Sequence, residues 1–163
     1  MGESWLILAD DLTGAADAAI AFARRGQRTE VTWGEHFAAD SSGASVLAYD
    51  CDSRRLGAEA AGAAQHAAAV RCLQRGAFSM LYKKIDSTLR GQPAAEIAAI
   101  HREVGARVVF APANPAMGRA TRGGRVFVRG QPLEQTETWR REPSYANADL
   151  VEILASAGLL LAR

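Results

Sequence analysis

The amino-acid sequence predicts an α/β fold, with a mostly parallel sheet flanked by helices on both faces and followed by a C-terminal β-hairpin and helix. Two observations lead to this prediction. Short apolar runs of strand character alternate along the chain with longer, alanine-rich stretches of helical character. The connections between them are short, which is typical of β-α-β units and places helices on both sides of a parallel sheet.

The elements are expected in a regular order. The apolar run at residues 4–9 ends in two aspartates and predicts a buried strand. Further strands are expected at residues 29–33, 46–49, 78–85 and 107–111, with a loop rich in glycine, serine and aspartate at residues 34–44. Helices are expected at residues 13–25, 56–75 and 93–104, the last beginning with a proline in its first turn. The hairpin is expected at residues 125–133, with its turn near Arg129 and Gly130, and the last helix at residues 149–161.

Length and composition favour a single domain. The chain has 163 residues, of which 48% are apolar, and this length is too short for two full enzyme domains. Alanine supplies 34 of these residues, so we expect a core of small side chains. No run approaches the ~20 consecutive apolar residues of a membrane span, and residues 1–20 lack the basic start of a secretory signal. We therefore expect a cytoplasmic protein with no membrane partner.

Cysteine usage and charge distribution narrow the classes of partner. Cys51 and Cys72 are the only cysteines, and without a Cys-x-x-Cys pair or a histidine cluster we expect reduced thiols and no metal site. The net charge is +1, but residues 75–130 are strongly basic and the segments on either side are acidic. The basic segment is either a solvated face or a site for an anion. We expect no nucleic-acid partner, because no aromatic residues are interleaved with the basic ones.

Three polar loops each follow an expected strand, at residues 10–14, 86–91 and 112–118. Because the carboxyl ends of parallel strands lie at one edge of a sheet, we expect these loops to meet there. That edge is where open α/β sheets bind ligands. The expectation requires all three strands to run parallel.

Asp10 and Asp11 stand where the first strand gives way to a helix. Neighbouring residues there point in opposite directions, so we expect the two carboxylates to have different roles. One accepts a hydrogen bond from a substrate hydroxyl or acts as its base, and the other caps the helix or holds a metal. A plain helix cap is the commoner reason for an aspartate at such a position.

Residues 83–91, Lys-Lys-Ile-Asp-Ser-Thr-Leu-Arg-Gly, carry the densest polar chemistry. An arginine binds a carboxylate or phosphate through two parallel hydrogen bonds, a lysine acts as a point charge, and the amides of the following helix add donors. The order of glycine and lysine differs from that of a phosphate-binding Gly-x-x-x-x-Gly-Lys loop. The alternative is a strand end with solvated charges. The candidate ligand-binding residues are Lys83, Lys84, Asp86, Ser87, Arg90 and Gly91.

Residues 112–119 form a stiff loop, because two prolines fix their own φ angles and Gly118 permits a tight bend. Asn114 and Arg119 are placed to reach a ligand from it. A plain turn accounts for the same pattern, so both interpretations stay open.

Taken together, three segments resemble the four-carbon acid sugar kinase family: residues 9–17, residues 83–91, and residues 112–119 with Gly123 and Gly124. Proteins of that family were long described as a domain of unknown function, and some were labelled type III effectors. Residues 126–133 and 141–143 resemble the family's later hairpin and the turn after it. Glu142 stands where the family has aspartate, and the resemblance is weak from Ser144 onward.

The resemblance implies an ATP-dependent kinase that phosphorylates the terminal hydroxyl of a four-carbon acid sugar such as threonate, erythronate or an oxo-tetronate. It also implies two domains, of which residues 1–163 correspond to the N-terminal, sugar-acid-binding one. We expect the nucleotide-binding domain of the family to be absent from this chain. ATP and Mg²⁺ are therefore implied for the full-length family, and we expect neither to be bound by this chain alone.

The same resemblance assigns roles to the candidate residues. Arg90 and Lys84 face the substrate carboxylate or the charge on the transferring phosphoryl group. Asp10 and Asp11 contact the hydroxyls, one of them as base. Two other interpretations remain open, a catalytically silent sugar-acid-binding module and an effector-like protein-interaction module. Self-association is expected, because a domain that normally packs against another exposes an apolar patch when isolated, for which residues 159–161 are a candidate.

Overall fold

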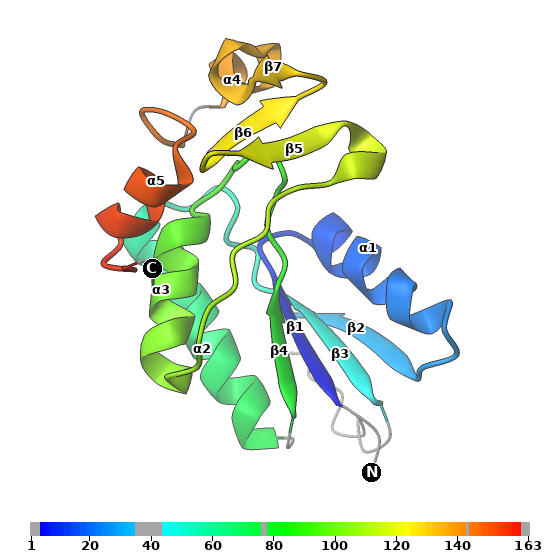
Figure 1. Ribbon diagram of the computed structural model, residues 1–163. Helices are drawn as coiled ribbons and strands as arrows, with labels where there is room; N and C mark the ends of the chain where they lie inside the picture. Colours follow the sequence, from blue (N-terminus) through cyan, green and yellow to red (C-terminus); the bar gives the residue numbers. More distant parts are fainter. Residues whose placement is uncertain (1–3, 35–43, 76–77, 143, 161–163) are drawn as a thin grey trace.

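A computed structural model describes residues 4–34, 44–75, 78–142 and 144–160, and its centre is a four-stranded parallel sheet (Figure 1). The strands are β1 (Trp5–Ala9), β2 (Thr29–Trp33), β3 (Val46–Asp50) and β4 (Met80–Lys83). Their order across the sheet is β2-β3-β1-β4, and each neighbouring pair is parallel. The predicted strands 4–9, 29–33 and 46–49 are confirmed to within one residue, and the strand predicted at 78–85 is shorter. Most of the loop predicted at residues 34–44 lies outside the described residues.

Helices cover both faces of this sheet, as predicted (Figure 1). They are α1 (Leu12–Ala23) on one face and α2 (Ala58–Arg75) with α3 (Pro93–Val104) on the other. Side chains of a strand alternate between faces, so Leu6 and Leu8 of β1 pack with α2 and α3 while Ile7 packs with α1. The three predicted helices are confirmed, and their ends differ from the predicted ends by at most two residues.

The core is built from small side chains, as the alanine content predicts. Ala15 and Ala19 of α1 are buried against the sheet, and alanines of α2 and α3 line the contact between those two helices. A Cβ atom at Gly62 of α2 would lie 3.3 Å from the backbone oxygen of Ala95, so only glycine permits this close approach without a shift. Small residues thus let the two helices approach closely over the sheet.

The expected fifth strand at residues 107–111 is wrong, because this segment forms no ladder with β4 and β4 is the edge of the parallel sheet. Gly105, with a φ of 66°, ends α3, and the chain then returns beside β4. A groove of about 410 Å³ separates the two segments. Val109 is 86% exposed, and Phe110 packs on the C-terminal cluster. The short apolar run of a strand is present, but its side chains are not buried between layers.

A small antiparallel sheet with short helices lies above the carboxyl ends of the parallel strands (Figure 1). We call this part of the fold the upper layer. It comprises β5 (Arg119–Arg122), β6 (Arg125–Val128) and β7 (Gln131–Pro132), two 3-10 helices, η1 (Pro115–Met117) and η2 (Leu133–Gln135), and the helices α4 (Glu137–Arg141) and α5 (Leu150–Ser156). The predicted hairpin is confirmed as β6 and β7, and β5 and α4 were not predicted. The last helix is shorter than predicted because Gly158, at a φ of 79°, ends it.

One apolar cluster joins the two layers. Leu89, from the loop after β4, packs with Val126 of β6 and Leu150 of α5, and all three are at least nine-tenths buried. The antiparallel sheet is therefore fixed over the loops at the carboxyl edge of the parallel sheet. No helix of the described residues has the length and apolar character needed to cross a membrane.

Truncation of a buried side chain and truncation of an exposed one are expected to change the free energy of unfolding by different amounts. Leu6→Ala removes a fully buried side chain between β1 and the α2–α3 layer, and we expect it to lower the free energy of unfolding by about 2–5 kcal/mol. Val109→Ala is the matched control in the segment that forms no strand, and we expect a change within about 0.5 kcal/mol. Urea unfolding followed by circular dichroism measures both. A large loss for Val109→Ala would contradict the exposed placement of residues 107–111.

Candidate functional site

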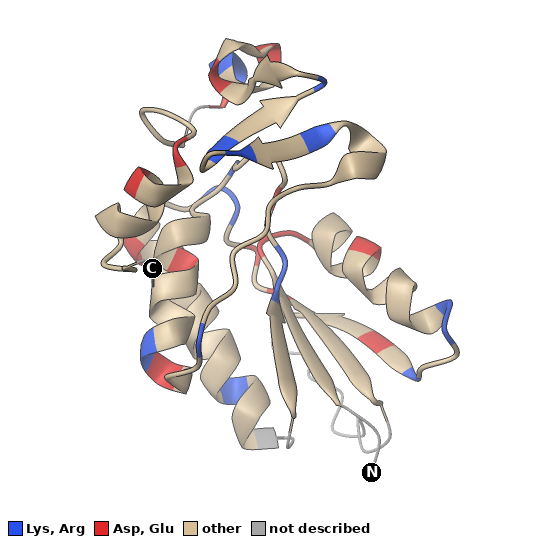
Figure 2. Ribbon diagram, in the orientation of Figure 1, with Lys and Arg blue, Asp and Glu red and all other residues tan. Residues whose placement is uncertain are grey.

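Loops after β1, β3 and β4 meet at the carboxyl edge of the parallel sheet. The backbone N–H groups of Ser53 and Arg54, after β3, each donate to the Asp10 carbonyl at 3.0 Å. In the loop after β4, a Cβ atom at Gly91 would lie 3.0 Å from Oδ2 of Asp10 and 3.6 Å from Cδ of Arg54. Gly91 therefore permits a close approach of the two loops. Figure 2 shows acidic and basic segments meeting at this edge, beneath the antiparallel sheet.

Arg54 joins the two predicted aspartates. Its Nε atom donates to Oδ2 of Asp10, its Nη2 atom to Oδ1 at 2.8 Å, and its Nη1 atom lies 3.0 Å from Oδ2 of Asp11. Burial disfavours the charged guanidinium, but the hydrogen bond and negative charge of Asp10, with a smaller effect of Asp11, raise the pKa of Arg54. A bidentate contact of this kind fixes both position and charge.

Asp10 and Asp11 have different surroundings, as predicted. Asp10 is 2% exposed, and both of its carboxylate oxygens accept from Arg54. Asp11 is the N-cap of α1, where Oδ1 accepts from the Gly14 N–H at 2.7 Å. A Cβ atom at Gly14 would lie 2.7 Å from that same oxygen, so glycine is required there. The capping role is thereby confirmed for Asp11, and its partly exposed carboxylate is the accessible one of the pair.

The loop after β4 is wound around the Asp86 carboxylate. Oδ2 of Asp86 accepts from the N–H and hydroxyl of Thr88 and from Nε of Arg90 at 3.0 Å, and Oδ1 accepts from Nη2 of Arg90 at 3.0 Å. Burial opposes the charge, but the hydrogen bonds from Arg90 and Thr88 hold the pKa of Asp86 well below its usual range. Asp86 thus organises the loop, and Leu89 adopts a φ of 60° within it.

Arg90 lies at the surface of the site with two of its nitrogen atoms on Asp86. Its Nη1 atom is 3.7 Å from Oε2 of Glu142, and its side chain is partly exposed. The hydrogen bond with Asp86 raises the pKa of Arg90, while burial and the positive charge of Arg54 lower it. The Nη1 side is therefore the part of this guanidinium that is not committed to Asp86.

The two lysines at the end of β4 point to opposite sides, as neighbours on a strand do. Lys83 forms a buried ion pair with Glu96 of α3, Nζ to Oε2 at 2.9 Å. Lys84 lies on the α1 side, where its Cγ atom would be 3.4 Å from a Cβ at Gly14, and its Nζ donates to the Ile85 carbonyl at 3.0 Å. Across the described ranges Lys84 forms no ion pair, so its charge is available to a ligand and that of Lys83 is not.

The third predicted loop does not follow a strand, because residues 107–111 form none. Asn114 and Arg119 pair with each other through two backbone hydrogen bonds of 3.0 and 2.9 Å at the start of β5. Asn114 is exposed, and Nε of Arg119 is buried without a hydrogen-bond partner among the described residues. Ser87 stays in the β4 loop and is partly buried. Residues 112–118 therefore belong to the upper layer, and the prediction that this loop follows a parallel strand is wrong.

Two residues of the site were missed by sequence reasoning, Arg54 and Asp50. Both stand in the polar segment at residues 50–55, at the end of the third strand, where two aspartates followed by two arginines are the signal that could have found them. Asp50 ends β3 and is 9% exposed. Burial raises its pKa, and the negative charges of Asp52, Asp11 and Asp10 raise it further, against a hydrogen bond from the Asp52 N–H.

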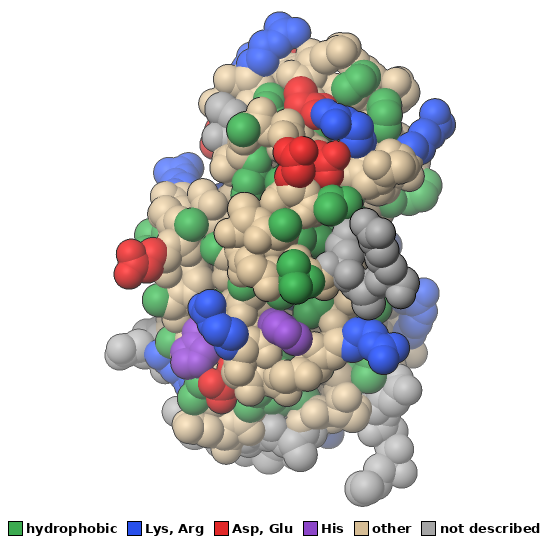
Figure 3. Space-filling view, turned by 60° about the vertical axis from the view of Figure 1, so that its left-hand side comes forward, with side chains coloured by type: hydrophobic (Ala, Val, Ile, Leu, Met, Phe, Trp, Pro, Cys, Tyr) green, Lys and Arg blue, Asp and Glu red, His purple; other side chains and the backbone are tan. Residues whose placement is uncertain are grey.

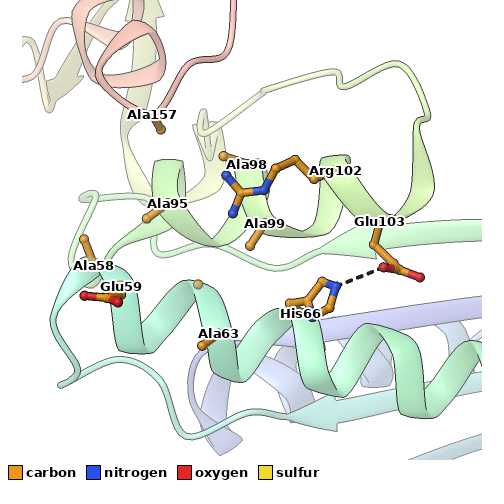
Figure 4. Close-up of a pocket in the computed structure, with 11 residues that line it drawn as sticks. Ala58, Glu59, Ala63, His66, Ala95, Ala98, Ala99, Arg102, Glu103 and Ala157 are labelled. Carbon is orange, nitrogen blue, oxygen red and sulfur yellow. Dashed lines mark hydrogen bonds and ion pairs between the residues drawn. The ribbon is translucent and has the colours of Figure 1, made fainter.

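A hollow of about 590 Å³ lies elsewhere, between α2 and α3 (Figure 4). Alanine side chains line it, with Arg102 and a 2.9 Å hydrogen bond between His66 and Glu103 at its edge. In Figure 3, histidine, basic and acidic side chains lie together on the lower part of the face that is shown. None of the aspartates or cations of the β1, β3 and β4 loops lines this hollow, so we place the candidate site at the sheet edge.

Comparison with known proteins decides the family. A family model described as a sugar-binding N-terminal domain matches residues 5–159. This chain belongs to that family. The chain is 54% identical over 157 residues to a D-threonate kinase of Cupriavidus necator, covering 96% of this chain and 37% of that protein. It is 33% identical over 156 residues to a D-erythronate kinase of Heliobacterium modesticaldum, covering 93% of this chain and 35% of that protein.

A solved structure confirms the fold of this chain. The protein, from Bordetella bronchiseptica, is described as a domain of unknown function, DUF1537, and was solved with bound citrate as a domain-swapped dimer. It superimposes with a TM-score of 0.86 at 34% identity, over 93% of this chain and 39% of that one. The resemblance found in the sequence is thereby confirmed, and the chain spans little more than a third of these relatives.

The depressed pKa of Asp86 predicts a contribution to acid stability. A carboxyl group with a lower pKa in the folded state stabilises that state above its unfolded pKa, about 3.9, and this stabilisation is lost as the pH falls through the folded value. We therefore expect the free energy of unfolding to fall more steeply below about pH 4 in the wild type than in Asp86→Asn. Denaturant unfolding at pH 7, 4 and 3 measures it. Parallel curves for the two proteins would contradict the assignment.

Proposed function

We propose that this domain binds a four-carbon sugar acid at the carboxyl edge of its parallel sheet and forms the substrate-binding part of an ATP-dependent kinase. The observation that carries the proposal is the meeting of Asp10 and Asp11 with Arg54, Lys84 and Arg90 at one edge. Relatives named D-threonate kinase and D-erythronate kinase support this substrate class, as does citrate, a small organic acid, in the Bordetella structure.

The chemistry of the site fits a small polyhydroxylated carboxylate. Lys84, which pairs with no carboxylate in the described ranges, supplies a point charge for the acid end of the substrate. The Nη1 side of Arg90 adds a directional donor. The Asp11 carboxylate is one-third exposed, so its remaining lone pairs accept hydrogen bonds from the substrate hydroxyls.

The proposed roles of the two aspartates differ. Asp10 is buried and held by two hydrogen bonds from Arg54, so it positions Arg54. Asp11 is the proposed hydroxyl ligand and the base for the terminal hydroxyl. Phosphoryl transfer depends chiefly on positioning and charge stabilisation, so little is required of this base. Four other predicted ligand residues are retained as contacts at the periphery of the site: Ser87, Gly91, Asn114 and Arg119. Lys83 and Asp86 are instead assigned a structural role, because each is engaged in an ion pair within the domain.

ATP and Mg²⁺ are assigned to a second domain. Among the described residues no group of three or more histidine, cysteine, aspartate or glutamate side chains is arranged to hold a metal ion, and the sequence has no Gly-x-x-x-x-Gly-Lys loop. The part of the relatives that this chain does not cover is long enough to supply one. We further propose a cytoplasmic location, since the reaction consumes ATP, and self-association, in line with the dimeric Bordetella relative.

Binding of the acid by the isolated chain tests the proposal. We expect calorimetry to detect weak binding of D-threonate or D-erythronate and none of threitol, which has the hydroxyls without the carboxylate. Arg90→Ala is expected to weaken binding at least tenfold, about 1.4 kcal/mol, because it removes an anion donor. Asn114→Ala, in the exposed loop of the upper layer, is expected to change it less than threefold. Equal small losses, or binding of threitol as tight as of the acids, would contradict the assignment of the site.

The isolated chain is expected to show no kinase turnover. The reaction needs charge stabilisation on the phosphates, and no residue of this chain is assigned to the nucleotide. ATP consumption in the presence of each four-carbon acid, followed by a coupled assay for ADP, measures it. Acid-dependent ADP formation by the 163-residue chain would overturn the division of roles between domains.

A further inference from the structure

A buried polar network lies directly behind the candidate site. At its centre is Glu96 of α3, which is 1% exposed. Its Oε1 atom accepts from the hydroxyl of Ser53 at 2.6 Å, and its Oε2 atom forms the 2.9 Å ion pair with Nζ of Lys83. Carboxylates are almost never buried to this extent unless they are paired, and here both oxygens have a partner.

Gln65 of α2 extends the network to β1. Its Nε2 atom donates to the Ser53 hydroxyl at 3.0 Å and to the Ala9 carbonyl at 3.1 Å. Ser53 and Gln65 are fully buried. The network therefore connects α2, α3, the end of β1, the end of β4 and the loop after β3.

Two cations of the candidate site, Arg54 and Lys84, each stand next to a residue of this network. Ser53 precedes Arg54, and the backbone N–H groups of both donate to the Asp10 carbonyl. Lys83 precedes Lys84, and Nζ of Lys83 donates to the Lys84 carbonyl at 2.8 Å. Glu96 thus holds the neighbour of Arg54 with one carboxylate oxygen and the neighbour of Lys84 with the other.

We propose that Glu96 is a positioning residue of the sugar-acid site, which fixes the Arg54 loop and the Lys84 strand end relative to each other. This inference rests on the proposed function. A buried ion pair adds little net stability compared with apolar side chains of similar volume, so stability alone does not account for it. Its two oxygens impose one geometry on two segments that are far apart in the sequence, which an apolar contact would not do.

Glu96→Gln tests the positioning role. The amide retains an acceptor for Ser53 but loses the charge that holds Lys83. The control is Glu103→Gln, the same substitution on the same helix, where the carboxylate is exposed and contacts His66. We expect the affinity for D-threonate, measured by calorimetry on folded protein, to fall at least tenfold for Glu96→Gln and to stay within twofold for Glu103→Gln.

A second readout requires no ligand. The Nε–H proton of Arg54 is hydrogen-bonded to Asp10, and its exchange with solvent is measurable by nuclear magnetic resonance. We expect faster exchange in Glu96→Gln and unchanged exchange in Glu103→Gln. Wild-type exchange of this proton in Glu96→Gln would overturn the inference.

The double variant Lys83→Met/Glu96→Leu separates positioning from stability. It replaces the ion pair with apolar side chains, and we expect its unfolding temperature to return toward that of the wild type while the affinity stays at least tenfold weaker. Wild-type affinity in this variant would also overturn the inference. If the wild type itself binds no four-carbon acid, the proposed function fails, and exchange of the Arg54 proton still decides the role of Glu96.

Discussion

The ion pair between Arg54 and Asp10 is the interaction on which the arrangement of this domain depends. Asp10 directly follows β1 and is 2% exposed, so its carboxylate is removed from water and requires a compensating charge. Arg54 supplies that charge from a loop 44 residues later, through two hydrogen bonds. Removing one partner of such a pair typically costs about 3–5 kcal/mol, because the other charge is left buried. The contact that stabilises the sheet edge therefore also sets the geometry of the candidate site.

Side chains alternate between the two faces of a strand, so neighbouring polar residues can have a structural role on one face and a ligand-binding role on the other. Lys83 and Lys84 are neighbours of the same chemical type, yet one is in a buried ion pair with Glu96 and the other is on the α1 side without a carboxylate partner among the described residues. The same geometry separates the apolar residues of β1 between the two helical layers. Structural and ligand-facing charges can thus follow each other directly in the sequence.

The loop at residues 86–91 connects the two layers of the molecule. Its hydrogen bonds converge on Asp86 and fix Arg90, while Leu89 packs in the apolar cluster beneath the antiparallel sheet. The guanidinium of Arg90 also lies 3.7 Å from Glu142, so this loop contacts both layers. In the proposed function, this loop therefore connects the binding site for the substrate carboxylate to the upper layer.

The sequence by itself determined the parallel sheet, the helices on both faces and the aspartate and lysine-arginine segments, because apolar periodicity and strand ends are local signals. It also indicated that Asp10 and Asp11 differ. Only the tertiary structure decided that Arg54 joins those aspartates, since no local pattern specifies which loop supplies a partner. It likewise decided that residues 107–111 form no strand, because a strand needs a hydrogen-bonded neighbour and burial, which its own residues cannot supply.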